Sequence, residues 1–259
     1  IPVDAALHGD LKTTLRALNE ALRSSHGMPR FDDWAREASS ERSKLPRDNF
    51  GHITLHATDV LDAFFAIAPG DTVVSTDVGQ HQMWSAQRCR PIHPSYFLTS
   101  AGLGSMGFGL PASIGAQFAH PTKTSVAIVG DGGFQMSLPE LATIKRYELP
   151  VKILLIDNRN LGMVRQWQQL FYDARYSATN LSDNPDFLMI AQAYGIPAET
   201  VSKPADLPGA LDRFLNEPGA RFLHCACYPE ENCWPMIPAG AAIDEGIEEA
   251  PDTFVGAAR

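Results

Sequence analysis

The stretch SVAIVGDGG, residues 125–133, decides the fold class. Its first five residues are small or apolar, which is typical of a short strand buried on both faces of a parallel sheet. The stretch VKILLIDN, residues 151–158, repeats this arrangement, because an apolar run is again followed directly by polar residues. A helix over Leu138–Glu148 is predicted between them. A strand, a helix and a second strand form a right-handed crossover, so we expect the two strands to lie side by side.

The predicted helix has sequence signals at both ends. Ser137-Leu138-Pro139-Glu140 fits a capping box with proline in the first turn, and Leu149-Pro150 ends the helix. The alternation of strands and helices continues on both sides of this unit. Further strands are predicted at Thr72–Thr76 and Ala220–Cys227, and further helices at Thr54–Ala68, Leu110–Ala119, Asp186–Tyr194 and Ala205–Glu217. This pattern predicts an α/β fold, with a parallel sheet and helices on both of its faces.

The N-terminal part of the chain differs from this alternation. Val3–Gly9 is predicted to be a short strand, and Asp10 to cap a helix over Leu11–Arg23. A second short helix is expected around Asp32–Ser43. We expect four parts in the chain, namely the end of a preceding domain, a polar linker, the main domain and a C-terminal arm, at residues 1–23, 24–49, 50–228 and 229–259.

Composition excludes several classes of protein. The formal net charge is -9, so nucleic-acid binding is not expected. No apolar run approaches the ~18 residues that span a bilayer. The first ten residues do not resemble a signal peptide, so we expect a cytoplasmic protein. The four cysteines form no C-x-x-C pair, and we expect buried, reduced thiols at Cys225, Cys227 and Cys233.

Polar residues follow both central strands at the point where each strand ends. Asp131 follows the first strand and Asn158 the second. Adjacent parallel strands lie ~4.8 Å apart, so two oxygen ligands could share one magnesium ion. The neighbouring glycines allow backbone N–H groups to approach a phosphate, and a helix N-terminus favours its negative charge. The sequence therefore predicts a magnesium and phosphate site at this edge of the sheet.

The spacing from Gly130-Asp131-Gly132 to Asn158 resembles the motif of thiamine diphosphate enzymes. Three longer segments, and Asn184-Pro185-Asp186-Phe187 after them, are similar to the acetolactate synthase family. The segments are Thr76–Trp84 (TDVGQHQMW), Gly102–Pro111 (GLGSMGFGLP) and Leu161–Trp167 (LGMVRQW). The similarity extends over residues 50 to 240, and corresponds to the C-terminal part of the catalytic subunit.

The resemblance implies how the cofactor is held. Magnesium would be bound by the side chains of Asp131 and Asn158 and by the main-chain carbonyl of Asn160. Two residues would flank the aminopyrimidine ring, namely Gly104 and Met106. The diphosphate and the rest of the cofactor would be contacted by Gly79, Gln80, His81, Gly132, Gly133 and Gly162.

The resemblance also implies a catalytic side of the site. Met136 would support the bend of the cofactor, and the second substrate would arrive along Met163, Val164 and Trp167. Without the resemblance, the helical spacing from Met163 to Phe171 is typical of an apolar stripe that faces the core. A methionine such as Met136 is likewise typical of core packing. His81 could likewise be a structural histidine.

Gly102-x-Gly104-x-x-Gly107 also fits the dinucleotide-binding fingerprint, with Asp131 near the expected acidic position. This interpretation is disfavoured, because Phe97–Ala101 is a poor buried strand and Pro111 delays the helix. It also leaves Asp157-Asn158 unexplained.

The resemblance implies decarboxylation of pyruvate and carboligation to a second 2-keto acid. It implies a homodimer or tetramer of catalytic subunits, a small regulatory subunit, and FAD held mostly outside this chain. The activating glutamate would come from a separate domain of the partner subunit, so this chain alone is expected to be inactive. Two alternatives remain open, namely another enzyme of the superfamily, such as a glyoxylate carboligase or pyruvate oxidase, and a non-catalytic cofactor-binding module.

Overall fold

The computed structural model describes residues 3–25, 30–42 and 54–248. The chain divides into two units, residues 1–45 and 46–259. The first unit contains helices α1 (Leu11–Ser24) and α2 (Asp32–Arg42), as the sequence predicts. Asp10 caps α1, because its Oδ1 accepts a hydrogen bond of 2.9 Å from the backbone N–H of Thr13.

The strand predicted at Val3–Gly9 is wrong. These residues form no strand, and all of them are exposed. A strand is stable only where a neighbour pairs with its backbone, and within the described residues none pairs with this segment. The four leucines of α1 are also exposed, by 40–71% of their surface.

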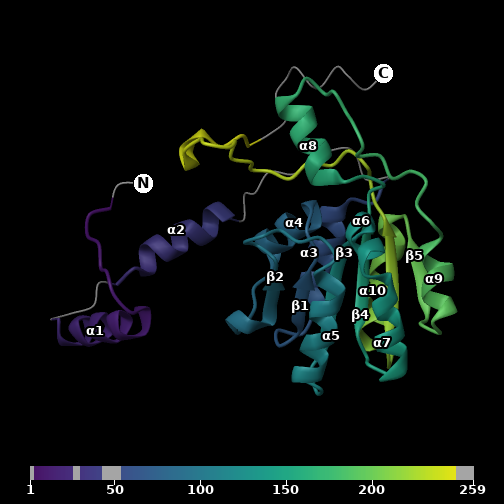
Figure 1. The fold of residues 1–259 in the computed structure, drawn as a ribbon, viewed down its shortest axis with the longest axis horizontal. Coiled ribbons are helices and arrows are strands. Elements are labelled where there is room, and N and C mark those ends of the chain that lie inside the picture. Colours follow the sequence, from purple (N-terminus) through teal and green to yellow (C-terminus); the bar gives the residue numbers. More distant parts are fainter. Residues whose placement is uncertain (1–2, 26–29, 43–53, 249–259) are drawn as a thin grey trace. The chain divides into compact units, whose positions relative to one another are not determined.

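The second unit is built on a six-stranded parallel sheet, which confirms the predicted fold class (Figure 1). The strand order is β2-β1-β3-β4-β6-β5. The strands are β1 (Val73–Thr76), β2 (Phe97–Thr99), β3 (Ser125–Gly130), β4 (Lys152–Asp157), β5 (Ala198–Val201) and β6 (Arg221–Ala226). The four predicted strands are the four central ones, and β3 pairs with β4 as the crossover requires.

The sequence did not predict the two edge strands. β2 has only three residues, all half-buried, so Phe97–Ala101 lacks the pattern of a buried strand. β5 carries the polar residues Glu199 and Thr200. An edge strand need not be apolar on both faces, so the pattern of a buried strand is absent from both.

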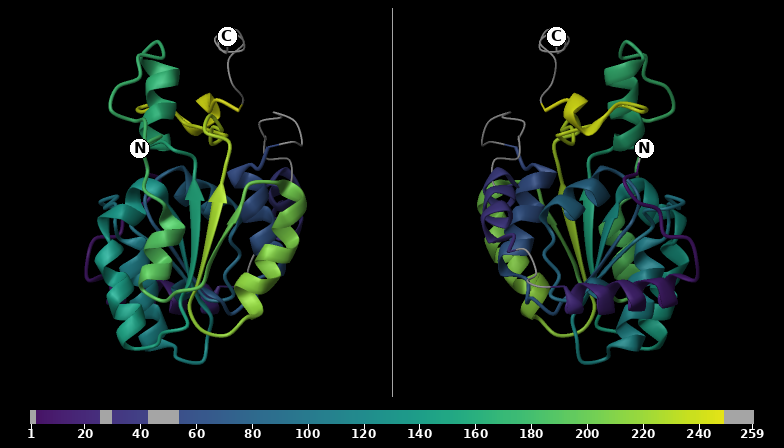
Figure 2. Two further views of the ribbon diagram at one scale, coloured as in Figure 1. Left: turned by 90° about the vertical axis from the view of Figure 1, so that its right-hand side faces the viewer. Right: turned by 90° about the vertical axis from the view of Figure 1, so that its left-hand side faces the viewer.

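Helices cover both faces of this sheet (Figure 2). Alternate residues of β3 enter opposite cores, with Val126 and Ile128 in one and Ala127 and Val129 in the other. The first core contains side chains of α3 (Ala57–Ile67), α4 (Gln80–Arg88) and α10 (Leu207–Asn216). The second core contains side chains of α5 (Gly109–Ala119), α6 (Asp131–Met136), α7 (Leu141–Arg146) and α9 (Phe187–Ala193).

The crossover between β3 and β4 differs from the single helix predicted at Leu138–Glu148. α6 begins directly at Asp131, a 3-10 turn follows at Leu138–Glu140, and α7 comes next. Pro139 has no N–H to continue an α-helix, so the chain breaks there. The predicted capping box does not form, because Ser137 makes no side-chain cap and Glu140 accepts from the hydroxyl of Thr143 instead.

Two further elements shape the carboxyl edge of the sheet. Helix α8 (Gly162–Phe171) projects beyond this edge (Figure 2). Residues 231–236, here called the C-terminal segment, are packed into the unit, and Glu231, Cys233 and Trp234 are buried. Within the C-terminal arm predicted at residues 229–259, residues 231–236 are therefore anchored to the domain. Among the described residues no helix has the length and apolar character to cross a membrane.

Candidate functional site

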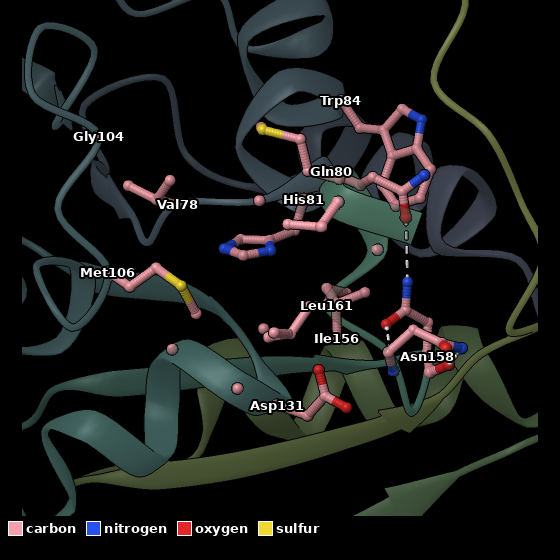
Figure 3. A pocket seen from close by; sticks show the side chains of 18 residues that line it. Val78, Gln80, His81, Trp84, Gly104, Met106, Asp131, Ile156, Asn158 and Leu161 are labelled. Atoms are coloured by element: carbon pink, nitrogen blue, oxygen red, sulfur yellow. Dashed lines mark hydrogen bonds between the residues drawn. The ribbon is translucent and has the colours of Figure 1, made fainter. Parts of the chain in front are cut away.

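A cavity of 160 Å³ lies at the carboxyl ends of the central strands (Figure 3). Its walls come from the ends of β1, β3 and β4, from the loop before α5, and from the start of α8. The residues that line it are Val78, Gly79, Gln80, His81, Trp84, Gly104, Met106, Gly130, Asp131, Gly132, Gly133, Ile156, Asn158, Asn160, Leu161, Gly162, Met163 and Val164.

The two candidate metal ligands lie at neighbouring strand ends, as predicted. Gly130 of β3 pairs with Ile156 of β4, and Asp131 and Asn158 follow one and two residues later. Asp131 is only 2% exposed. Burial, together with the charge of Asp157, raises the pKa of Asp131 to about 7. A buried carboxylate in this environment is stabilised by a donor or a cation.

A network of polar residues lies behind Asp131. Asn184 Nδ2 donates to Asp131 Oδ2 (2.8 Å) and, more weakly, to Asp157 Oδ1 (3.4 Å). Asp157 Oδ2 in turn lies 2.8 Å from His224 Nε2, and His224 Nδ1 lies 3.1 Å from the hydroxyl of Thr200. Burial alone would raise the pKa of Asp157, but its hydrogen bonds with His224 and with the N–H of Arg159 lower it.

Asn158 has a different set of contacts. Its Nδ2 donates to Gln80 Oε1 (3.1 Å), and its Oδ1 accepts from the N–H of Asn160 (3.2 Å). Gln80 Nε2 donates to Gln166 Oε1 (2.8 Å) and to the main-chain oxygen of Glu231 (2.9 Å). The amide group of Gln80 is thus already bonded to the protein at both of its atoms.

His81 is buried against the backbone and lies among the residues that line the cavity (Figure 3). A Cβ at Gly79 or Gly130 would lie 2.9 or 2.8 Å from its ring, so both glycines make room for it. Burial lowers the pKa of His81 to about 4, so the ring is neutral near pH 7. Its Nε2 is buried without a hydrogen-bond partner in the described structure. A ligand group that forms a hydrogen bond with this atom would satisfy it.

Asp77 is a functional residue to which sequence reasoning assigned no role. Its fully buried carboxylate accepts hydrogen bonds from the N–H groups of Val78, Gly107 and Gly109, at 2.8–3.0 Å. It fixes the glycine-rich loop that leads into α5. The N–H of Gly107 is therefore not available to a pyrophosphate, which argues against a dinucleotide site.

Thirteen of the fifteen predicted site residues line the cavity. The two others, Met136 and Trp167, lie outside the lining of this cavity. Met136 is 59% exposed, and Trp167 is half-buried against Phe171, with ring centroids 5.1 Å apart. The alternative interpretation of α8 as a core stripe is wrong, because Met163 and Trp167 are half-buried and Val164 and Phe171 are exposed. The alternative interpretation of Met136 as a core residue is also wrong, because its side chain is exposed.

Three further residues of the site were not predicted from the sequence, namely Asn184, Gln166 and His224. Asn184 and Gln166 belong to segments that resemble the acetolactate synthase family, but the resemblance implies no role for either. His224 has no spacing in the sequence that relates it to Asp157. Only the pairing of β4 with β6, which aligns Leu155 with His224, brings it near.

Residues 77–225 match the family described as "Thiamine pyrophosphate enzyme, C-terminal TPP binding domain". The chain belongs to the thiamine pyrophosphate enzymes. The matched region spans β1 to β6 and contains the strand ends that form the cavity. Thiamine pyrophosphate, also called thiamine diphosphate, is therefore the cofactor that this domain binds.

Individual relatives of this thiamine pyrophosphate enzyme are acetolactate synthases. The chain is 47% identical to the acetolactate synthase isozyme 2 large subunit of Escherichia coli, over 94% of this chain and 43% of that protein. It is 42% identical to the chloroplastic acetolactate synthase of Arabidopsis thaliana, over 93% of this chain and 38% of that protein. The chain thus spans about two fifths of the length of these relatives.

The residues of the cavity fit a diphosphate and a divalent cation. The unpartnered Nε2 of His81 offers a buried polar atom for a hydrogen bond with the cofactor. A Cβ at Gly132 would lie 2.7 Å from the end of the Leu161 side chain, so glycine keeps this stretch of backbone open without displacing Leu161. Among the described residues no three His, Cys, Asp or Glu side chains form a metal-binding group. A cation at this site would therefore take further ligands from amide, main-chain and phosphate oxygens, as magnesium does.

Proposed function

We propose that this chain is the cofactor-binding part of an acetolactate synthase. In this reaction pyruvate loses carbon dioxide and its remaining two-carbon unit is joined to a second 2-keto acid. The observation that supports the proposal best is the pair Asp131 and Asn158 at neighbouring strand ends, in a chain that is 47% identical to an acetolactate synthase over 94% of its length.

Magnesium and the diphosphate bind together in this proposal. Asp131 and Asn158 supply side-chain oxygens to the cation, and Asn160 supplies its main-chain carbonyl. His81 contacts the diphosphate, and the open backbone at Gly132 and neighbouring glycines supplies N–H donors. These groups anchor and orient the cofactor, which lowers the entropy cost of reaching the reactive geometry.

The walls of the cavity provide the environment for the reaction. When bound, thiamine diphosphate supplies an electron sink for decarboxylation of a 2-keto acid. The apolar side chains of Val78, Met106 and Leu161 exclude water from the cavity, while Met163 and Val164 form the wall along which the second substrate arrives. Asp131 is the only acidic side chain among the described residues of the lining, and it binds the cation.

A general acid or base for the aminopyrimidine must therefore come from elsewhere. We propose that a glutamate of a partner subunit supplies it, in a cytoplasmic homodimer or tetramer that also holds FAD and a small regulatory subunit. In the proposed organisation residues 1–23 end a preceding domain, 24–49 form a linker, 50–228 form the domain that binds thiamine diphosphate and magnesium, and 229–259 complete the chain.

The test is product analysis on the full-length protein with pyruvate, thiamine diphosphate and magnesium. Acetolactate, lost on addition of EDTA and restored by excess magnesium, is the expected result. Acetate or acetyl phosphate from pyruvate would indicate an oxidase, and tartronate semialdehyde from glyoxylate would indicate a glyoxylate carboligase. Cofactor binding with no product from either substrate would indicate a non-catalytic module.

A further inference from the structure

Two buried side-chain amides connect the C-terminal segment to the amide of Asn158. The chain of hydrogen bonds runs from the backbone of Cys233 through Gln166 and Gln80 to Asn158, and its last bond is drawn in Figure 3. Gln166 is 0% exposed, Gln80 4% and Asn158 6%. Water therefore has little access to these amides, and their orientations depend on one another.

The backbone of Cys233 determines the orientation of Gln166. The N–H of Cys233 donates to Gln166 Oε1 (2.9 Å), and Gln166 Nε2 donates to the carbonyl oxygen of Cys233 (2.9 Å). A backbone N–H can only donate and a carbonyl can only accept, so rotating the Gln166 amide by 180° would break both bonds.

Gln166 in turn determines the orientation of Gln80. The two groups that face Gln80 Nε2 are Gln166 Oε1 and the main-chain oxygen of Glu231, and both are acceptors. The NH₂ group of Gln80 must therefore point toward them, which leaves its oxygen facing Asn158.

The orientation of the Asn158 amide follows from that of Gln80. Its Nδ2 donates to Gln80 Oε1, so its Oδ1 faces the opposite way, where it accepts from the N–H of Asn160. With Asn158 rotated by 180°, an NH₂ group would take the place of the oxygen ligand. We propose that Gln166 and Gln80 are positioning residues that hold the amide oxygen of Asn158 toward the magnesium site, an inference that rests on the proposed magnesium binding.

Gly162, the first residue of α8, supports this assignment independently. A Cβ at Gly162 would lie 2.6 Å from Asn158 Nδ2 and closer still to Gln80 Oε1. The start of α8 thus leaves room for the Gln80–Asn158 pair, and any larger residue would separate the two amides.

The experiment titrates magnesium into the full-length protein in the presence of thiamine diphosphate. Quenching of tryptophan fluorescence reports cofactor binding and gives the apparent dissociation constant of magnesium. Gln166→Met removes the donor and the acceptor, and should raise this constant about 10–100-fold, the usual range for residues that orient metal ligands. Gln166→Glu, as a neutral acid, keeps both functions and should stay within about threefold of the wild type.

A matched control is Gln87→Met. Gln87 Nε2 donates to the main-chain oxygen of Trp234 (2.8 Å), so it also fastens the C-terminal segment, at a residue other than Cys233. The Gln87→Met variant should have a lower melting temperature but an unchanged dissociation constant for magnesium. If Gln166→Met does not fold, Gly162→Ala replaces it, since it acts on the last bond of the chain, and the same rise is expected.

A double-substitution cycle distinguishes positioning from general stability. The two oxygens of an aspartate are equivalent, so Asn158→Asp needs no orientation and instead places an oxygen against Gln80 Oε1. In that background Gln166→Met leaves Gln80 held only by the main-chain oxygen of Glu231, so Gln80 rotates more easily, and magnesium affinity should stay unchanged or improve. Two results would overturn the positioning role. The first is that Gln166→Met lowers magnesium affinity equally in the wild type and in Asn158→Asp. The second is that Gln166→Met and Gln87→Met have equal dissociation constants for magnesium. Wild-type protein that binds thiamine diphosphate equally well in EDTA would instead overturn the magnesium proposal itself.

Discussion

The ends of β3 and β4 present two candidate ligands that the protein holds in different ways. Asp131, at the end of β3, is a carboxylate with two equivalent oxygens, and one donor from Asn184 contacts it. Asn158, beyond β4, is an amide with two unlike ends, and Gln80, Gln166 and the backbone of Cys233 are needed to order it. A neutral amide ligand therefore requires more supporting structure than a charged carboxylate, because its orientation must be specified as well as its position.

The largest expected effect comes from removing the charged ligand. Asp131→Ala should weaken thiamine diphosphate binding in the presence of magnesium by about 100-fold or more, beyond the usual effect of residues around a metal. The diphosphate would then face uncompensated negative charge from Asp157. Calorimetric titration of the full-length protein gives the affinity, and unchanged binding would refute Asp131 as a magnesium ligand.

The donor behind Asp131 should affect stability next. Asn184→Leu leaves the carboxylate of Asp131 buried without that hydrogen bond, and should lower the free energy of unfolding by about 1–3 kcal/mol. Urea denaturation measures it. Asn216→Leu is the matched control, because Asn216 Nδ2 donates to Asp212 over the same 2.8 Å but at the exposed surface of α10. Equal losses in the two variants would contradict a special role for Asn184.

The hydrogen bond between Gln80 and Asn158 can be disturbed without substituting either residue. Gly162→Ala should raise the magnesium constant about tenfold, because the new Cβ intrudes between Gln80 and Asn158. Gly115→Ala, in the exposed part of α5, has nothing within 4 Å of the new Cβ and should stabilise the protein by about 0.5–1 kcal/mol. Unaltered magnesium affinity in Gly162→Ala would show that the Gln80–Asn158 bond does not matter.

The smallest effect on stability is expected on the outer side of α8. Trp167 is half-buried, so Trp167→Leu should cost about 1 kcal/mol of unfolding free energy, whereas Trp84→Leu in the core should cost about 3–5 kcal/mol. Trp167→Leu should leave magnesium affinity unchanged and alter the ratio of products formed with pyruvate and 2-ketobutyrate. An unaltered ratio with a large fall in melting temperature would assign Trp167 to packing.

The sequence predicted the parts of this site that depend on local pattern. Asp131 and Asn158 follow apolar strands of one crossover unit, so their proximity can be inferred from the strands alone. Gln166 and Cys233 lie 67 residues apart, and no local pattern relates a glutamine on a helix to the backbone of a distant segment. For the same reason the burial of Glu231, whose carboxylate accepts from the N–H of Ala57 at 2.7 Å, was not predicted.

The position of the C-terminal segment in the chain has a consequence for biosynthesis. Cys233 is translated more than seventy residues after Asn158. At ~5–20 residues per second, the ribosome reaches it about 4–15 s after the last strand-end ligand has been made. During that interval the central strands can already pair, but Gln166 lacks the backbone groups that orient it. The nascent domain therefore acquires its sheet before it acquires an ordered Asn158, and cofactor loading belongs to the last stage of its maturation.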